Sequence, residues 1–200
     1  MSKEQDPNQI DPAEVTSSPE SDEANLRSLA ESVPGLNLVP VPHSENGTFS
    51  SEEAEKVLEL VNSLIGKSWT DKDEVRNLEA SDIKVVAPFN AQVSRISKLL
   101  KAKGLDKVLV GTVDRFQGQQ AAVVIMSMAT SSPDEVSRGL DFLLSRNRLN
   151  VAISRGQWAT YLVYSPEITN IDAKTPDQIR LVSGFLQLVV GQYPLSRSIL

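Results

Sequence analysis

The feature that most constrains the fold is a nearly continuous apolar run, AVVIMSMA, at residues 122–129. A strand with one solvent-facing side alternates apolar and polar residues, whereas a strand covered on both faces is apolar along its length. Coverage of both faces is typical of a parallel sheet that lies between two layers of helices. The run therefore predicts a central strand of a mostly parallel sheet.

Strands and helices alternate along the rest of the chain. Short apolar runs predict strands at 38–41, 83–87, 108–113 and 160–164, and apolar stripes predict helices at 90–103, 146–155 and 176–190. On the helix at 90–103, we expect Val93, Ile96 and Leu100 to face inward and Gly104 to end the helix. The alternation predicts a three-layer α/β domain with right-handed crossovers.

One further helix has complete start and stop signals. Ser50 and Glu53 match a capping box, an apolar stripe runs over residues 54–65, and Gly66 suits a left-handed C-cap. The Gly66-Lys67-Ser68 triplet also matches the end of a P-loop, but Val61 stands where the first glycine is needed. We interpret Gly66 as a helix end followed by a charged loop, so this chain should hold no Mg-ATP by itself.

The composition leaves little room for a metal site. The chain has no cysteine and a single histidine, His43, which excludes a disulfide framework and leaves too few ligands for zinc. Asp114 follows an apolar strand as a magnesium ligand would, but Arg115 stands where a second acid would help. We expect no metal site within this chain.

Charge and apolar content divide the chain into three parts. Residues 1–23 hold seven acids and one lysine, which accounts for the whole net charge of −6. We expect a disordered acidic tail at 1–35, one ordered domain at 36–190 and a C-terminal tail at 191–200. No apolar stretch approaches the roughly 18 residues of a membrane helix and the chain opens polar, so we expect a cytoplasmic protein without membrane contact.

The ordered part is neutral as a whole but has a basic middle. Residues 84–155 hold eleven lysines and arginines against five acids. This local charge of +6 is compatible with a surface that faces nucleic-acid phosphates. Charge alone favours a solvated lysine face at least as well.

Three segments resemble the second, C-terminal RecA-like domain of superfamily 1 helicases, in the branch that moves 5′ to 3′. They are VVAPFNAQV at 85–93, GTVDRFQGQQAAVVIMS at 111–127 and NRLNVAISR at 147–155, and the order of elements extends the resemblance over roughly residues 36–185. The local similarity is closest to bacterial helicases joined to a RecB-like nuclease. The resemblance implies an α/β, three-layer RecA-like (P-loop NTPase-like) domain with a mostly parallel central sheet.

The first segment resembles helicase motif IV. The resemblance places Gln92 near a bound nucleotide. Several relatives have an arginine directly after this glutamine, where the chain has Val93, and Arg95 is the alternative further along the helix. Taken alone, the stretch APFNAQ is better explained as a strand end followed by a helix start.

The second segment resembles motif V, which links nucleotide state to nucleic-acid contact. Gly111 and Gly118 permit backbone conformations close to a ligand. Thr112 offers a hydroxyl to a nucleic-acid phosphate, and Asp114 with Gln117 supplies orienting hydrogen bonds.

One further residue of this segment departs from the family pattern. Relatives usually have a glutamate at the position of Gln120, where it accepts a hydrogen bond from the ribose of ATP. A glutamine oxygen still accepts, but without charge assistance, which implies a lower affinity for nucleotide.

The third segment resembles motif VI, and the resemblance makes Arg155 an arginine finger. A guanidinium from a neighbouring domain stabilises the charge that develops on a transferring phosphate. The same resemblance implies that Asn150 braces motif V and that Arg148, with Arg146, reaches nucleic acid or solvent. Relatives often have a second arginine two residues after the finger, whereas Gly156 and Gln157 here should loosen the helix end.

The resemblance implies half of a motor. The complete motor has two RecA-like domains, with ATP and Mg²⁺ between them and single-stranded nucleic acid, here expected to be DNA, across both. This chain would supply the arginine finger and coupling motifs, and a first RecA-like domain would be needed in cis or in trans. The alternative is a non-catalytic remnant that binds nucleic acid or protein, which the departures at Val93, Gln120 and Gly156 favour.

Overall fold

The computed structural model describes residues 34–116, 118–131, 139–170 and 173–190. Most of the expected acidic tail, the expected C-terminal tail and the motif V residue Gln117 lie outside these ranges. The fold and the site are therefore built from the remaining residues.

A five-stranded sheet forms the centre of the molecule, with the strand order β1-β7-β6-β4-β5. Every neighbouring pair is parallel, as the sequence predicts. The strands are β1 at Gly35–Pro40, β4 at Ile83–Val86, β5 at Leu109–Gly111, β6 at Ala121–Ser127 and β7 at Gly156–Tyr164. All seven residues of β6 are buried, which confirms the prediction from the apolar run.

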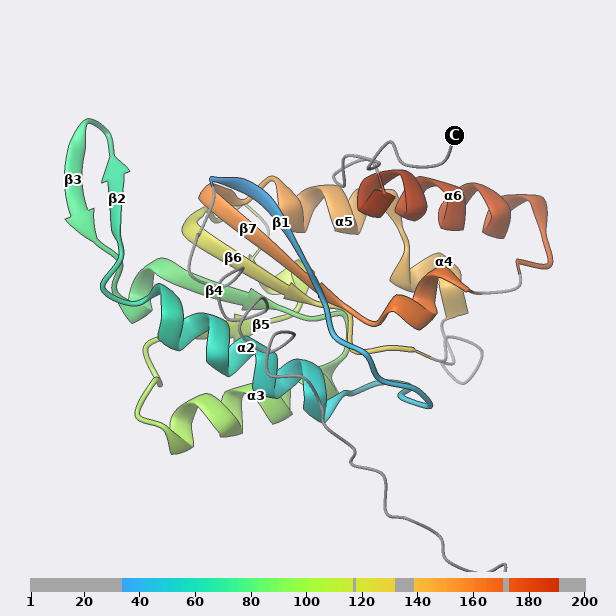
Figure 1. Cartoon of the computed structure of the whole chain (residues 1–200), viewed down its shortest axis with the longest axis horizontal. Helices are drawn as coiled ribbons and strands as arrows, with labels where there is room; N and C mark the ends of the chain where they lie inside the picture. Colours follow the sequence, from blue (N-terminus) through green and yellow to red (C-terminus); the bar gives the residue numbers. More distant parts are fainter. Residues whose placement is uncertain (1–33, 117, 132–138, 171–172, 191–200) are drawn as a thin grey trace, which may run out of the picture. The chain divides into compact units, whose positions relative to one another are not determined.

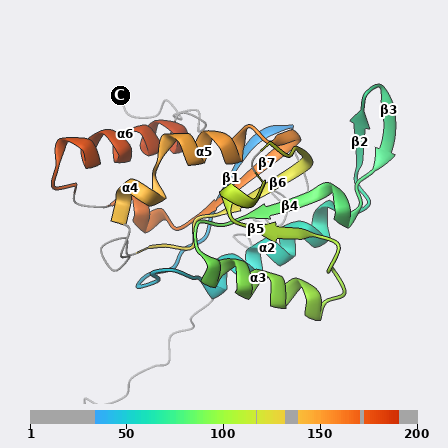
Figure 2. The ribbon, with the colours of Figure 1, turned by 180° about the vertical axis from the view of Figure 1, so that it is seen from behind.

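Helices cover both faces of this sheet, so the α/β, three-layer architecture is confirmed. Figures 1 and 2 show α2 and α3 on one face and α5 and α6 on the other. The helices are α2 at Ser51–Leu64, α3 at Asn90–Ala102, α4 at Gly139–Leu143, α5 at Arg146–Ile153 and α6 at Pro176–Val190. Short 3-10 turns, η1, η2 and η4, lie at Ala80–Asp82, Val113–Phe116 and Pro166–Thr169. Within the described ranges, none of the helices has the length and apolar content needed to cross a membrane.

A β-hairpin occupies the region that the sequence indicates only as a charged loop. Strands β2 at Ser68–Asp71 and β3 at Glu74–Asn77 pair with each other and stand out from the central sheet (Figure 1). Lys72 and Asp73 form the turn with positive φ angles of 48° and 75°, a conformation for which glycine or asparagine is the usual signal. Because the turn contains neither glycine nor asparagine, the sequence gives no signal for a hairpin here.

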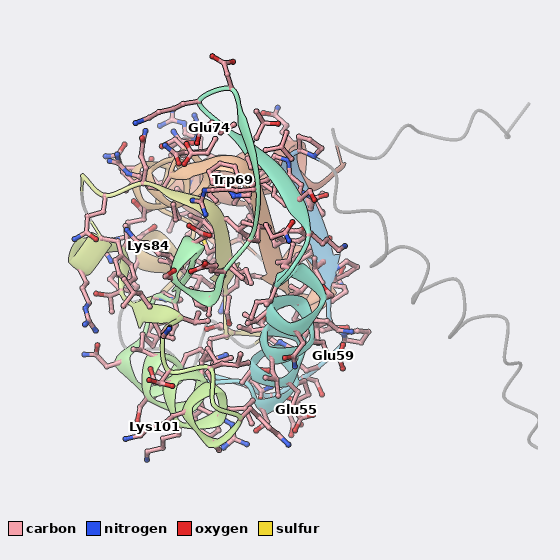
Figure 3. All side chains as sticks on the ribbon, turned by 90° about the vertical axis from the view of Figure 1, so that its left-hand side faces the viewer. Glu55, Glu59, Trp69, Glu74, Lys84 and Lys101 are labelled. Atoms are coloured by element: carbon pink, nitrogen blue, oxygen red, sulfur yellow. The ribbon has the colours of Figure 1, made fainter. Side chains whose placement is uncertain are left out.

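Contacts at the base of the hairpin hold it to the domain. Figure 3 shows Trp69 at this base, where its side chain is buried. The Arg76 guanidinium lies 4.8 Å from the centre of the Trp69 ring and donates two hydrogen bonds of 2.7 Å to the Asp82 carboxylate. These hydrogen bonds lower the pKa of Asp82 and raise the pKa of Arg76.

Only half of the capping box predicted at the start of α2 is formed. The Ser50 hydroxyl accepts a hydrogen bond from the Glu53 N–H at 3.0 Å, as expected. The Ser50 N–H, however, donates to Gln92 Oε1 at 2.9 Å, and the Glu53 side chain points into the protein. The reciprocal half of the prediction is wrong because a buried partner from α3 replaces Glu53.

The end of α2 confirms the interpretation of Gly66. The helix ends at Leu64, and Gly66 follows with a φ of 86° and donates its N–H to the Leu78 carbonyl at 2.8 Å. The triplet that begins at Gly66 thus joins a helix to strand β2. A P-loop joins a strand to the start of a helix, which is the opposite arrangement.

Candidate nucleotide and nucleic-acid interface

The parallel sheet separates the predicted site residues into two groups. Gln120 directly precedes β6 and Arg155 directly precedes β7, so both lie at the amino-terminal edge of two neighbouring strands. Thr112 follows β5 and Gln92 lies in the first turn of α3, which starts beyond the end of β4, so both lie at the carboxyl-terminal edge. The η2 turn belongs to the segment that leads from one edge to the other.

Arg155 lies in the turn between α5 and β7. The helix ends at Ile153, and the Arg155 carbonyl accepts a hydrogen bond from the Ala121 N–H at 3.1 Å, which ties the turn to β6. Its Nε atom is buried without a hydrogen-bond partner in the described part of the chain. No carboxylate of the described residues forms an ion pair with Arg155, so the ordinary structural role of a surface arginine is not seen here.

The prediction that Gly156 loosens the end of the helix is wrong. Gly156 is the first residue of β7, three positions beyond the last helical residue. A Cβ atom at this position would lie 2.5 Å from the Ala159 carbonyl oxygen, and the register between β6 and β7 is irregular at the same place. The residue is therefore a packing requirement of the strand.

Lys84 is not among the residues predicted from the sequence, yet it lies beside Arg155 in a small cavity that Gln119 and Phe116 also line. Lys84 is the second residue of β4 and is 8% exposed (Figure 3). Its Nζ donates to Gln119 Oε1 at 3.1 Å and to the Gln120 carbonyl at 3.0 Å. Burial lowers the pKa of Lys84. A lysine inside an otherwise apolar strand is a signal that could have identified it.

Gln120 keeps its side chain accessible at the same edge. Lys84 holds its backbone carbonyl, while its Oε1 accepts one hydrogen bond of 3.3 Å from Gln157 Nε2. Gly118 lies two residues earlier with a φ of 81°, a backbone conformation that favours glycine. Gln120 is thus held in place by its backbone carbonyl, while its side chain is exposed.

The rest of motif V packs tightly against itself. A Cβ on Gly111 would lie 2.6 Å from Arg115 Cδ and 3.0 Å from the Phe116 ring, so any larger residue here would force these side chains to shift. The Thr112 carbonyl accepts a hydrogen bond from the Arg115 N–H at 3.1 Å, which starts the η2 turn. The Thr112 hydroxyl makes no hydrogen bond to any described residue.

Motifs V and VI are connected through Arg148 and Asp114. Arg148 Nη2 lies 3.7 Å from Asp114 Oδ2, and the guanidinium lies 4.2 Å from the centre of the Phe142 ring. Asn150, for which the resemblance implies this bracing role, is exposed, and its side chain forms no hydrogen bond within the described ranges. Arg146 donates to the Arg180 carbonyl at 3.4 Å and so lies against α6.

Gln92 belongs to a buried polar network at the opposite edge. Its side chain is fully buried and accepts from the Ser50 N–H at 2.9 Å while it donates to Ser127 Oγ, also at 2.9 Å. Gln92 is therefore buried with Ile96 and Leu100 on the inward face of α3, and the expected Val93 is only half-buried. A direct contact between Gln92 and a nucleotide would require both of these hydrogen bonds to break.

Glu53 is the centre of that network. Its Oε2 accepts from Ser127 Oγ at 2.6 Å and from the Ala129 N–H at 2.8 Å, and its Oε1 lies 3.0 Å from His43 Nε2. Ala129 is fully buried and has a φ of 67°, which is a strained conformation for alanine. The carboxylate thus holds the strained segment that follows β6 in place.

A family model described as an AAA domain matches residues 36–167, which is most of the ordered part. The chain belongs to this AAA domain family. Family membership agrees with the parallel α/β architecture described above.

Curated relatives of this AAA domain are named as helicases. The chain is 47% identical over 78 residues to DNA polymerase alpha-associated DNA helicase A of Schizosaccharomyces pombe. The aligned stretch covers 39% of this chain and 11% of that protein. It is 31% identical over 123 residues to RNA helicase Mov10l1 of Mus musculus, covering 60% of this chain and 10% of that protein. It is 33% identical over 120 residues to DNA replication ATP-dependent helicase/nuclease DNA2 of Bos taurus, again covering 60% and 10%.

The chain thus spans about a tenth of the length of the curated relatives it matches. It is similar to one domain within helicase proteins.

Two basic side chains lie close together at the amino-terminal edge of the sheet. Arg155 and Lys84 line one small cavity, which places two cations beside each other. The Nε atom of Arg155 is buried without a hydrogen-bond partner, and none of the described carboxylates pairs with this arginine. The described residues contain no group of three or more His, Asp or Glu side chains placed to hold a metal ion. The donor set at this edge therefore suits an anion.

Proposed function

We propose that the chain is the second, C-terminal RecA-like half of an ATP-dependent superfamily 1 helicase. The observation that carries the proposal is the buried, unpaired Nε of Arg155, which lies beside Gln120 at the amino-terminal edge of the sheet. Similarity to domains of helicases supports the same reading. The substrate would be single-stranded nucleic acid, with DNA as our first expectation and RNA as the alternative.

A nucleotide would be held between this domain and a first RecA-like domain, present in cis or in trans. That other domain would supply the P-loop and the Mg²⁺ ligands, and bound ATP would supply the phosphoanhydride bond that is hydrolysed. Here Arg155 would donate hydrogen bonds to the terminal phosphate when the domains close. Gln120 would accept from the ribose, and Gly118 would permit its close approach.

Coupling between nucleotide and strand would depend on η2. Thr112 would donate its hydroxyl to a strand phosphate at the carboxyl-terminal edge, while Gln120 faces the nucleotide at the other edge. Arg148 and Asp114 would transmit movement of η2 to α5, with Asn150 and Gln117 as further candidates for this role. Gln92 would act as a positioning residue, through Ser50 and Ser127, at the start of α3.

Arg155 provides the test of this proposal. In a reconstituted two-domain protein, Arg155→Ala should lower strand-stimulated ATP hydrolysis by about a thousandfold or more, with little change in ATP or strand binding. Arg155→Lys should restore little activity, because an ammonium lacks the planar fork that reaches two oxygens. The matched control is Arg180→Ala on the exposed surface of α6, which should hydrolyse at the parental rate.

Hydrolysis by Arg155→Ala at the parental rate would show that Arg155 is structural. Thermal melting of each variant separates this outcome from unfolding.

The second candidate function is a remnant that binds nucleic acid or protein without hydrolysis. Val93 and Gln120 stand where relatives have charged residues, and the amide of Gln92 is committed to the internal network. A neighbouring reading frame that encodes a P-loop and an Asp-Glu magnesium motif would favour the motor. Absence of such a frame would favour the remnant.

A further inference from the structure

A groove with a volume of about 480 Å³ lies at the other end of the molecule from Arg155. The start of α2, with Ser51 and Glu55, forms one wall, and α3 from Ala91 to Leu99 forms the other. Phe49 and Ser51 line one end of it, and Ser94, Arg95 and Lys98 line the α3 wall. Of the candidate residues discussed above, Arg95 lines this groove, whereas Gln92, Thr112, Gln120 and Arg155 do not.

Phe49 is the aromatic surface of the groove. Its side chain is 48% exposed, which is unusual for an aromatic residue in a domain whose other phenylalanines within the described ranges are mostly covered. The backbone that carries it is fixed, because Gln92 accepts from the N–H of the next residue, Ser50. The Arg95 guanidinium lies 5.9 Å from the centre of the Phe49 ring. An exposed ring on a fixed backbone, with a planar cation beside it, suits the stacking of a nucleobase.

The α3 wall of the groove is basic. Helix α3 contains Arg95, Lys98 and Lys101 and no acidic residue, and Lys98 lies one turn beyond Arg95. Among the described residues, Arg95 and Lys98 form no ion pair. Glu55 on α2 is the acidic residue of the lining, and Figure 3 shows it on the opposite helix from Lys101. Phosphates would therefore bind to the α3 side.

The groove lies at the same edge of the sheet as Thr112. The Ala87 N–H donates to the Gly111 carbonyl at 3.1 Å, so the segment that leads into α3 runs beside the segment that leads into η2. A strand bound to Thr112 would thus pass the first turn of α3. Continuation along α3 brings it to Phe49, Arg95 and Lys98.

We propose that this groove binds single-stranded nucleic acid, with one base stacked on Phe49 and neighbouring phosphates held by Arg95 and Lys98. The inference deepens the proposed function and rests on it, because it extends the strand path from Thr112. It also adds what the basic middle of the chain lacks, an aromatic platform for a base.

Binding of the full 200-residue chain to labelled homopolymers tests the groove. The probes are fluorescein-labelled oligo-dT and oligo-rU of about 20 nucleotides, and fluorescence anisotropy is followed over a series of salt concentrations. Phe49→Leu should weaken binding about five- to tenfold with little change in salt dependence. Arg95→Gln should weaken binding and lower the slope of log K against log salt by about one.

Two exposed residues outside the groove provide matched controls. Lys107→Gln removes one positive charge at the amino-terminal edge, before β5, and should not reproduce the effect of Arg95→Gln. Val75→Ala removes apolar surface from the hairpin, where Val75 is 74% exposed, and should leave base stacking unchanged. All four positions are exposed, so each variant should melt close to the parental temperature.

The outcomes separate this inference from the proposed function. If Thr112→Ala weakens binding while Phe49→Leu and Arg95→Gln do not, the groove proposal is wrong and the strand role of motif V stands. If the parental chain binds neither homopolymer, both the groove and the strand contact of motif V are refuted. If labelled poly-glutamate binds as tightly and with the same dependence on Phe49, the groove takes an acidic protein partner instead.

Discussion

Replacement of Glu53 by alanine should destabilise the domain more than any surface substitution. Its carboxylate is fully buried and accepts from Ser127 Oγ, from the Ala129 N–H and from His43 Nε2. After truncation, Ser127 still has Gln92 as a partner. The Ala129 N–H and the His43 ring would each be left buried without an acceptor.

The expected magnitude follows from those two orphaned groups. A buried polar group without a partner costs about 1–3 kcal/mol, and the removed side-chain atoms leave a small cavity. We therefore expect Glu53→Ala to lower the free energy of unfolding by about 3–5 kcal/mol, or the Tm by roughly 10 °C for a domain of this size. Glu53→Gln should lower the free energy of unfolding by less. The glutamine carbonyl still accepts hydrogen bonds from Ala129 and Ser127, and only the contact with His43 is replaced by an amide NH2 group.

Urea unfolding followed by circular dichroism measures this loss. The matched control is Glu59→Ala on the outer face of α2, where the carboxylate is 56% exposed and pairs with Lys56. The control should change the free energy of unfolding by less than about 0.5 kcal/mol. A loss below about 1 kcal/mol for Glu53→Ala would refute the reasoning, because it would mean that Ala129 and His43 find other partners without cost.

Three further predictions concern other parts of the molecule. The hydrogen bonds from Arg76 lower the folded pKa of Asp82, so the stability they add is present above the ordinary aspartate pKa of about 4 and is lost as the pH falls through the lower folded value. Urea midpoints should therefore fall more steeply in acid for the parental chain than for Asp82→Asn, and parallel curves would contradict this. Gly111→Ala should cost about 1–3 kcal/mol in urea unfolding, because its methyl group meets Phe116 and Arg115, and an unchanged midpoint would show that η2 adapts freely. The purified chain should show no ATPase activity above background with or without single-stranded DNA, and turnover stimulated by the strand would overturn the half-motor reading.

The parallel sheet could be predicted because its signals are local and strong. The apolar run of β6 has no polar face, and helix α6 begins and ends at the residues that its apolar stripe indicates. Gln120 directly precedes β6, close to the start of the strand predicted at 122–129. The sequence predicts Arg155 at the end of a helix at 146–155, whereas the helix ends at Ile153 and Arg155 lies in the turn directly before β7. The roles of these residues stay predictions.

The missed features depend on contacts between residues far apart in the chain. Glu53 matches a capping box by spacing, but partners 74 and 76 positions away take its carboxylate. The Gln92 amide similarly replaces that carboxylate at the Ser50 N–H, 42 positions away. Lys84 stands out in the sequence as a lysine within an apolar strand, but only the folded chain brings its ammonium to Gln119 and Gln120. The local sequence pattern does not show which of several polar side chains will form a given hydrogen bond in the folded chain.

The hairpin formed by β2 and β3 is a part of the domain that can vary in length without a change in the five-stranded sheet. Its strands pair only with each other, and the register of the five-stranded sheet does not pass through them. Its tip at Lys72 and Asp73 can therefore lengthen, shorten or carry an attached dye while the base stays fixed by Trp69, Arg76 and Asp82. The tip is therefore a place where this domain can take an insertion or an attachment without a change in the central sheet.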